Sequence, residues 1–250
     1  MTGTELLPAR LSDELDVLAA RLTSAEGTAI RMLNYFGGRA ENLLERLPDW
    51  AKDELERGTE RALGYAVEAA QVSRGSLPDQ PAWVNTGLTT VLGAAGGAGG
   101  LPTALAELPV TTTVLFRAIL GTAALHGFDP AEMEVRREGL TVFSAAGPLE
   151  HDDGANMGFL AARVTLTGAT VRSVIARVAP RLSVVLGQKL AAQTVPVLGA
   201  AAGAATNYAY TRYYQEMAHV HFGLARLARE GGHDTVVLTE ALRARLPRRD

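Results

Sequence analysis

Two long stretches without a charged residue constrain the fold of this chain more than any other feature. Trp83–Ala106 carries no charge over 24 residues, and Leu190–Thr211 carries none over 22. Each could span a bilayer on length alone, because about 20 helical residues cross the hydrocarbon core. However, the first contains six glycines and the second contains Gln193 and Asn207, which weakens partitioning into lipid. Three interpretations stay open: a buried helix of a soluble protein, a contact with the membrane surface, or a true span.

The composition of the whole chain excludes several classes of chemistry. There is no cysteine among the 250 residues, which excludes disulfides, thiolate nucleophiles and cysteine-ligated metal sites. Hydrophobic residues make up 47% of the chain but aromatic ones only 6%, so the core must be built from aliphatic side chains and alanine. The first residues show no basic region followed by an apolar run, which predicts a cytoplasmic protein without a signal peptide.

Apolar residues recur at helical spacing along most of the chain, and no segment alternates with a period of two. Ser12, followed by two acidic residues, is expected to cap a first helix that buries Leu15, Leu18 and Leu22. Pro180 is expected to bend or break a helix. The other expected helices cover about 25–47, the segment after Asp49, 110–125, 131–145, 156–179, 181–192, 197–227 and 235–245. We therefore predict an all-α fold, a single compact domain of about eight to ten helices.

Charge is distributed unevenly. The net charge is −3, but no acidic residue lies between Asp153 and Glu216. That interval carries Arg163, Arg172, Arg177, Arg181, Lys189 and Arg212. It is therefore +6, and the rest of the chain is −9. The overall charge predicts no nucleic-acid partner. The first four of these arginines are candidates for a basic surface that contacts anionic lipid, unless they pair with acidic residues elsewhere.

A short internal repeat lies in the two uncharged stretches. Val91–Ala98 and Val197–Ala204 are identical at seven of eight positions. Each copy places two glycines four residues apart, and residues at i and i+4 share one face of a helix. The glycines are Gly93 and Gly97 in the first copy and Gly199 and Gly203 in the second. We expect these faces to pack on each other or to line one groove, unless the repeat is a chance similarity of Ala/Gly-rich sequence.

Five polar residues stand isolated inside apolar sequence: Glu107, Arg117, Lys189, Gln193 and Asn207. A buried charge without a partner is costly, so these groups should pair or reach water. Three interpretations follow: a buried ion-pair network of Glu107 with Arg117 or Lys189, a functional polar cluster, or side chains that extend to solvent. The glycine run lacks the Gly-Lys-Ser/Thr ending of a phosphate loop, and the five histidines show no metal-binding spacing. We predict no metal and no cofactor.

The order of several motifs resembles the EcsC family of bacterial proteins. Those motifs are Gly96-Gly97-Ala98-Gly99-Gly100-Leu101-Pro102, Glu107-Leu108-Pro109, Arg117-Ala118-Ile119, His126-Gly127-Phe128-Asp129-Pro130, Lys189-Leu190-x-x-Gln193, Val195 to Ala200, Gly203 and Asn207. The resemblance covers about Ala25 to Leu227, and it departs from the family at His126, where a tyrosine is expected. It divides the chain into an N-terminal helix (1–24), an EcsC-like helical domain (25–230) and a C-terminal tail (231–250). It implies an α-helical protein of poorly defined biochemistry, associated with transport, secretion or the membrane.

These observations predict a non-enzymatic helical protein that acts at the cytoplasmic face of the membrane or on an apolar partner. Its expected partner is an anionic lipid surface or a membrane protein. One alternative is a hydrolase-like enzyme with a polar pocket around Glu107, Arg117, Lys189 and Asn207. A second alternative is a soluble scaffold for protein interactions.

Overall fold

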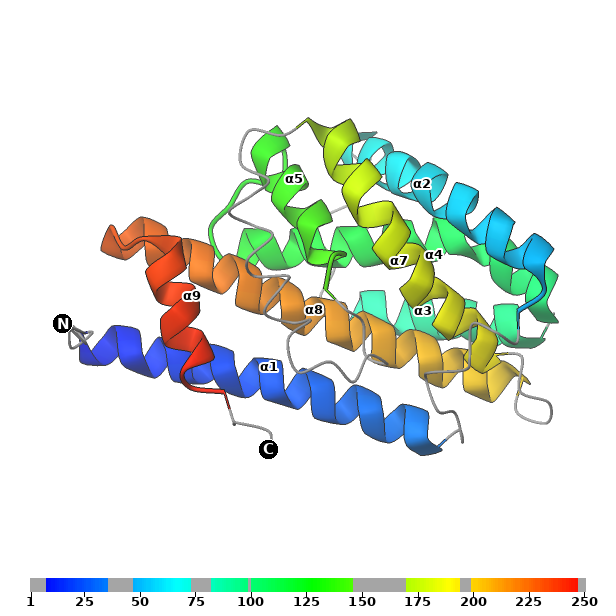
Figure 1. The fold of residues 1–250 in the computed structure, drawn as a ribbon, viewed down its shortest axis with the longest axis horizontal. Helices are drawn as coiled ribbons and strands as arrows, with labels where there is room; N and C mark the ends of the chain where they lie inside the picture. Colours follow the sequence, from blue (N-terminus) through cyan, green and yellow to red (C-terminus); the bar gives the residue numbers. More distant parts are fainter. Residues whose placement is uncertain are drawn as a thin grey trace.

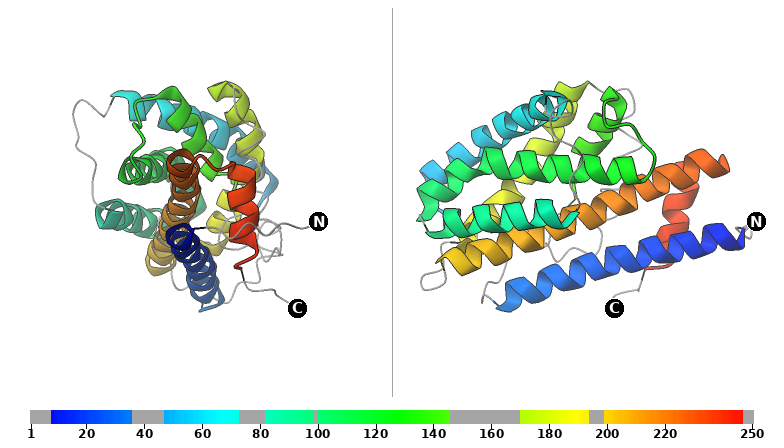
Figure 2. Two further views of the ribbon diagram at one scale, coloured as in Figure 1. Left: turned by 90° about the vertical axis from the view of Figure 1, so that its left-hand side faces the viewer. Right: turned by 180° about the vertical axis from the view of Figure 1, so that it is seen from behind.

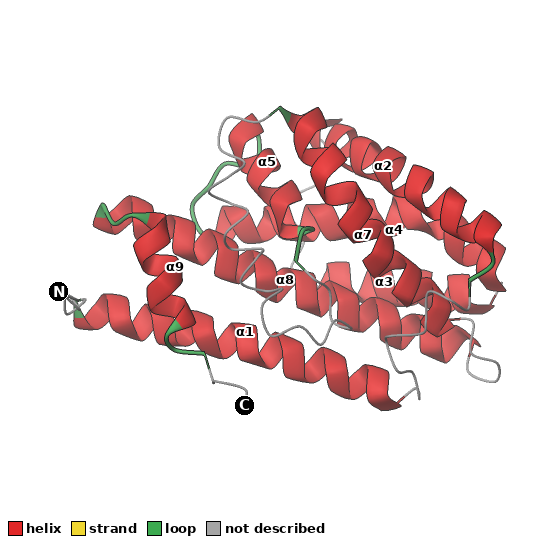
Figure 3. Ribbon diagram, viewed as in Figure 1, coloured by secondary structure: helices red, strands yellow, loops and turns green. Residues whose placement is uncertain are grey.

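Helices form nearly all of the chain that the structure, a computed structural model, describes (Figure 1, Figure 3). The described residues are 8–35, 47–72, 82–98, 100–145, 170–193 and 199–246. The helices within them are α1 (Ala9–Tyr35), α2 (Asp49–Val72), α3 (Ala82–Ala98), α4 (Gly100–Leu125), α5 (Met133–Val142), α7 (Val171–Gln193), α8 (Gly199–Gly231) and α9 (Thr235–Arg243). No strand occurs in these ranges. The predicted all-α fold is confirmed.

Helix α1 corrects two predicted boundaries. It begins at Ala9, and the Ser12 N–H already bonds to the carbonyl of Pro8 (3.0 Å), so Ser12 does not cap it. The helix break expected before Ala25 is also wrong. Ala25 is buried like the leucines before it, so the apolar stripe continues past the expected break, and the helix ends at Tyr35. Residues 36–46, including the predicted bend at Gly37-Gly38, lie outside the described part.

Two prolines that were expected to lie at helix boundaries lie inside helices. Helix α4 begins at Gly100 rather than at Val110 and contains Pro109, and α7 continues through Pro180. A proline removes one helical N–H donor. At both sites a later hydroxyl donates to the proline carbonyl, from Thr113 (2.8 Å) and Ser183 (2.7 Å). Both helices bury apolar residues on each side of the proline, so tertiary packing outweighs the lost bond.

The long helix α8 forms the centre of the molecule, with α1, α3, α4 and α7 against it (Figure 2). Its buried face carries large aromatic side chains, among them Tyr210, Tyr214 and Phe222. Phe143, just after α5, packs edge-on against Tyr214 with 5.2 Å between ring centroids. Helix α9 packs on α1 and α8, and Arg245 beyond it bonds to Asp16 (2.8 Å). The core therefore surrounds α8 and leaves α3 at the outside.

Candidate functional site

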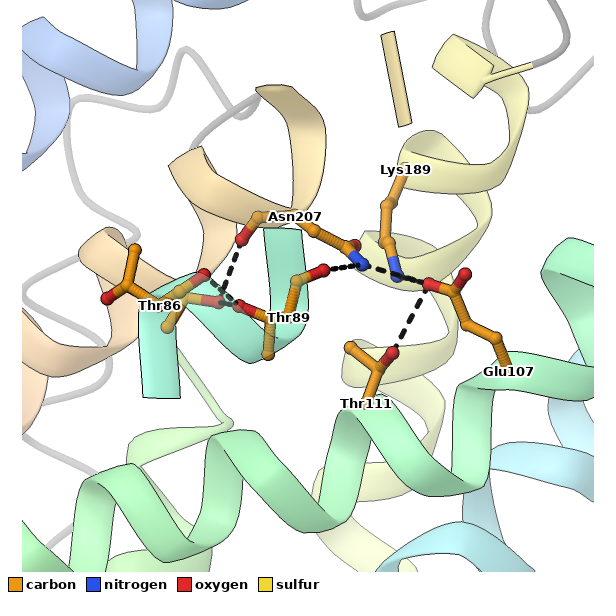
Figure 4. A network of polar contacts seen from close by, with 7 residues as sticks. Thr86, Thr89, Glu107, Thr111, Lys189 and Asn207 are labelled. Atoms are coloured by element: carbon orange, nitrogen blue, oxygen red, sulfur yellow. Dashed lines mark hydrogen bonds and ion pairs between the residues drawn. The ribbon is translucent and has the colours of Figure 1, made fainter. Parts of the chain in front are cut away.

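Four helices meet at a buried polar network that includes three of the predicted residues (Figure 4). Lys189 of α7 pairs with Glu107 of α4, with 2.9 Å between Nζ and Oε1. Asn207 of α8 donates from Nδ2 to Glu107 Oε1 (3.0 Å) and to the carbonyl of Thr89 on α3 (2.7 Å). The Thr111 hydroxyl also donates to Oε1 (3.2 Å). We call Glu107, Lys189, Asn207, Thr89 and Thr111 the polar network.

The charges of the polar network are closed off from solvent. The Lys189 side chain is 1% exposed and that of Glu107 is 7% exposed. Burial lowers the pKa of Lys189, while the nearby Glu107 carboxylate acts in the opposite direction. A lysine with a lowered pKa has the chemistry of an amine nucleophile, but such a role requires access for a substrate. In the described structure the pair instead ties α4 to α7, and Asn207 ties the same carboxylate to α8.

Glycines on α3 make the space that the polar network occupies. A Cβ on Gly96 would overlap Oε2 of Glu107 and lie 2.9 Å from its Cδ. A Cβ on Gly93 would overlap the carbonyl oxygen of Gly203 and lie 2.6 Å from Asn207 Nδ2. The structure thus brings one glycine of each repeat copy together. The contacts of Gly97 and Gly199 lie outside the described part.

Threonines extend the polar contacts along the interface between α3 and α8. The hydroxyls of Thr89 and Thr211 are 2.7 Å apart, and Thr86 donates to Gln215 Oε1 (3.4 Å). These residues were not predicted from the sequence. A signal was present, because Thr86, Thr89, Gly93 and Gly96 recur at helical spacing. Residues this small did not indicate the buried face of a helix. These four are the buried positions among the described side chains of α3.

The buried and exposed faces of α3 are therefore the reverse of those of an ordinary surface helix, which turns its large apolar side chains inward. None of its described residues belongs to the hydrophobic core. Three of its large apolar side chains face outward, with Trp83 75% exposed, Val91 68% exposed and Leu88 48% exposed. Val84 and Leu92 are half-buried. We call Trp83, Leu88, Val91, Ala95 and Ala98 the α3 outer face; all of them are exposed.

Among the described helices, α4 is long and apolar enough to cross a membrane, but 61% of that stretch is buried in the protein.

The other candidate residues lie apart from the polar network. Arg117 is half-buried on α4 and makes no hydrogen bond or ion pair with a described residue. The side chain of Gln193 and all of Arg163 lie outside the described part. Arg172 and Arg177 are exposed, and Arg181 is half-buried, in the first half of α7. Figure 1 places that half beside α5 rather than beside α3.

A histidine pair joins the end of α4 to α8, and the sequence analysis did not identify it. Nε2 of His126 and Nδ1 of His219 are 3.1 Å apart. Burial lowers the pKa of His126 to about 4, and His219, Arg226 and Arg21 add to this effect. Burial and Arg21 likewise lower the pKa of His219. Both rings are therefore neutral at pH 7 and share one hydrogen bond.

We expect this pair to make stability depend on pH. Each folded-state pKa lies below the unfolded value of 6.5, so the unfolded chain binds more protons as the pH falls below 6.5, and stability is lost toward about pH 4. The expected loss of stability between pH 7 and pH 5 is about 1–2 kcal/mol. It is not larger because both rings are only partly buried, and solvent screens their interactions. Urea unfolding at several pH values measures it. A His126→Gln variant should show a smaller loss, and an equal loss would contradict the assignment.

Comparison with known families identifies the chain. The model of the EcsC protein family matches residues 73–227, which is more than half of the sequence. The chain belongs to the EcsC protein family. The EcsC match is shorter than the expected 25–227, and α1, α2 and α9 lie outside it. Every residue of the polar network lies inside it. Comparisons with curated proteins and with solved structures found no match.

Proposed function

We propose that this chain is a non-enzymatic helical protein that docks on the cytoplasmic face of the membrane through the α3 outer face. One observation carries the proposal: α3 places glycine and threonine inward and turns Trp83, Leu88 and Val91 outward. Each apolar side chain left in water forgoes about 1.5–3 kcal/mol of burial. Contact with lipid would recover that free energy.

The inner side of α3 also supports a lipid partner. Association of helices in lipid relies on close backbone approach and on hydrogen bonds, because the hydrophobic effect does not drive it there. The α3–α8 interface contains both kinds of contact, in the Gly93–Gly203 approach and in the bond between Thr89 and Thr211. Trp83 near the start of α3 has an amphipathic ring of the kind enriched at membrane interfaces.

The proposal differs from the sequence-based expectation in the residues on which it depends. The expectation joined the basic stretch to the uncharged stretches, but Arg172 and Arg177 lie on the part of α7 next to α5 (Figure 1). We therefore base docking on α3. The hydrolase alternative is supported less well, because Arg117 is outside the polar network and Lys189 is 1% exposed.

A matched pair of valine substitutions tests the proposal. Val91 in the α3 outer face is 68% exposed, and Val17 on α1 is 57% exposed. A Val91→Glu change should weaken binding to phospholipid vesicles at least about tenfold, because a carboxylate would enter the apolar contact. Co-sedimentation measures binding, and Val17→Glu should bind like the wild type. Failure of the wild type to co-sediment with any vesicle, or equal binding by the two variants, would refute the proposal.

A further inference from the structure

A single basic side chain lies on the outward stripe of α4. Thr103, Ala106, Val110, Thr113 and Arg117 recur at spacings of three and four, so they share one face of the helix. All five are exposed or half-buried. In the left panel of Figure 2, α3 and α4 lie next to each other along one side of the molecule. Arg117 therefore brings a positive charge to the side that carries the α3 outer face.

Arg117 is also level with Trp83 along the α3–α4 hairpin. Gly96 faces Ala104 and Glu107 across that hairpin, which fixes the register of the two antiparallel helices. Trp83 lies thirteen residues before Gly96, and Arg117 lies thirteen residues after Ala104. At about 1.5 Å per residue, both positions are about 20 Å from these contacts. The aromatic ring and the guanidinium thus lie at the same end of the uncharged surface.

No carboxylate among the described residues pairs with the guanidinium of Arg117. Between residues 80 and 128 the only Lys, Arg, Asp or Glu residues are Glu107 and Arg117, and Glu107 is buried with Lys189. Other arginines do pair, such as Arg21 with Glu216 (2.7 Å) and Arg226 with Glu14. Arg117 makes no such contact with any described residue. Its five N–H donors remain available in a geometry that suits a phosphate group.

We infer that Arg117 binds the phosphate of an anionic phospholipid while the α3 outer face contacts the acyl chains. This inference rests on the proposed function, which places that surface on the bilayer. A long arginine side chain can lie along apolar surface and hold its charge at the headgroup level. A basic group at that level favours anionic over neutral lipid by about fivefold. Arg117 is then a specificity-determining residue, and α3 supplies the binding that does not depend on headgroup charge.

Vesicle binding with two lipid compositions tests the inference. Wild-type protein should bind vesicles containing phosphatidylglycerol about fivefold better than pure phosphatidylcholine vesicles. Arg117→Gln should bind both kinds as the wild type binds phosphatidylcholine. The matched control is Arg177→Gln, an exposed arginine on α7, which should keep the preference. A thermal unfolding curve for each variant verifies that the fold is retained.

The possible failures are distinguishable. If the wild type shows no preference, or if Arg117→Gln keeps all of it, the inference is wrong while docking through α3 stands. If Arg177→Gln loses the preference instead, α7 holds the headgroup and the inference is also wrong. If the wild type binds neither composition, the proposed function itself fails.

Discussion

Replacing Lys189 with methionine should lower the free energy of unfolding by about 3–5 kcal/mol. Methionine has a similar length but no charge, so the change leaves the buried Glu107 carboxylate without its cation. Thr111 and Asn207 would still donate to Oε1, but neutral donors do not balance a charge at a site that is closed to water. Urea unfolding followed by circular dichroism measures the loss.

The chain contains its own control, because Lys52 is its other lysine. Lys52 also pairs with an acid, Asp49 at 3.2 Å, but both side chains are exposed. Lys52→Met should therefore change stability by less than about 0.5 kcal/mol. A double variant with Glu107→Gln and Lys189→Met should be more stable than Lys189→Met alone, because it removes the unpaired charge. If Lys189→Met costs no more than Lys52→Met, the ion pair is not buried in solution.

The polar network could be predicted in part from the sequence. The cost of burying a charge singled out Glu107, Lys189 and Asn207, and the structure places all three together. The sequence left open whether Arg117 or Lys189 pairs with Glu107. The pairing with Arg117 fails because α4 begins at Gly100, so both residues lie on one helix and are about 15 Å apart along its axis. The choice of Lys189 depends on how α7 packs against α4, which no local pattern contains.

The orientation of α3 could not be predicted. The rule that apolar side chains turn inward would bury Trp83 and Val91 and expose the threonines. The structure has the reverse, because the buried positions of α3 must accommodate the Glu107 carboxylate and the backbone of α8. The predicted helix start at Val110, just after Pro109, and the predicted break between residues 179 and 181 failed for a related reason, since packing on both sides of each proline holds the helix together. Local signals are reliable here only where tertiary contacts do not oppose them.

Replacing Gly93 with alanine should destabilise the protein by about 2–4 kcal/mol. The added Cβ would overlap the carbonyl oxygen of Gly203 and crowd the Asn207 amide at 2.6 Å. A rotamer change can move a side chain, but it cannot move the backbone oxygen, so α3 and α8 would have to separate. Separation would also strain the bond from Asn207 to the carbonyl of Thr89 (2.7 Å) and expose the polar network.

The same substitution at Gly87 separates this packing effect from the intrinsic effect of alanine on α3. Gly87 lies six residues earlier and is exposed, and a Cβ added there would have no atom within 4 Å. Gly87→Ala should stabilise the protein by about 0.5–1 kcal/mol, because alanine favours the helix. Thermal and urea unfolding of both variants give the comparison. Opposite signs are expected because one glycine is required by a neighbouring backbone and the other is not. A stabilising Gly93→Ala would mean that α3 and α8 do not approach as closely as the structure places them, and the repeat would then have no packing role.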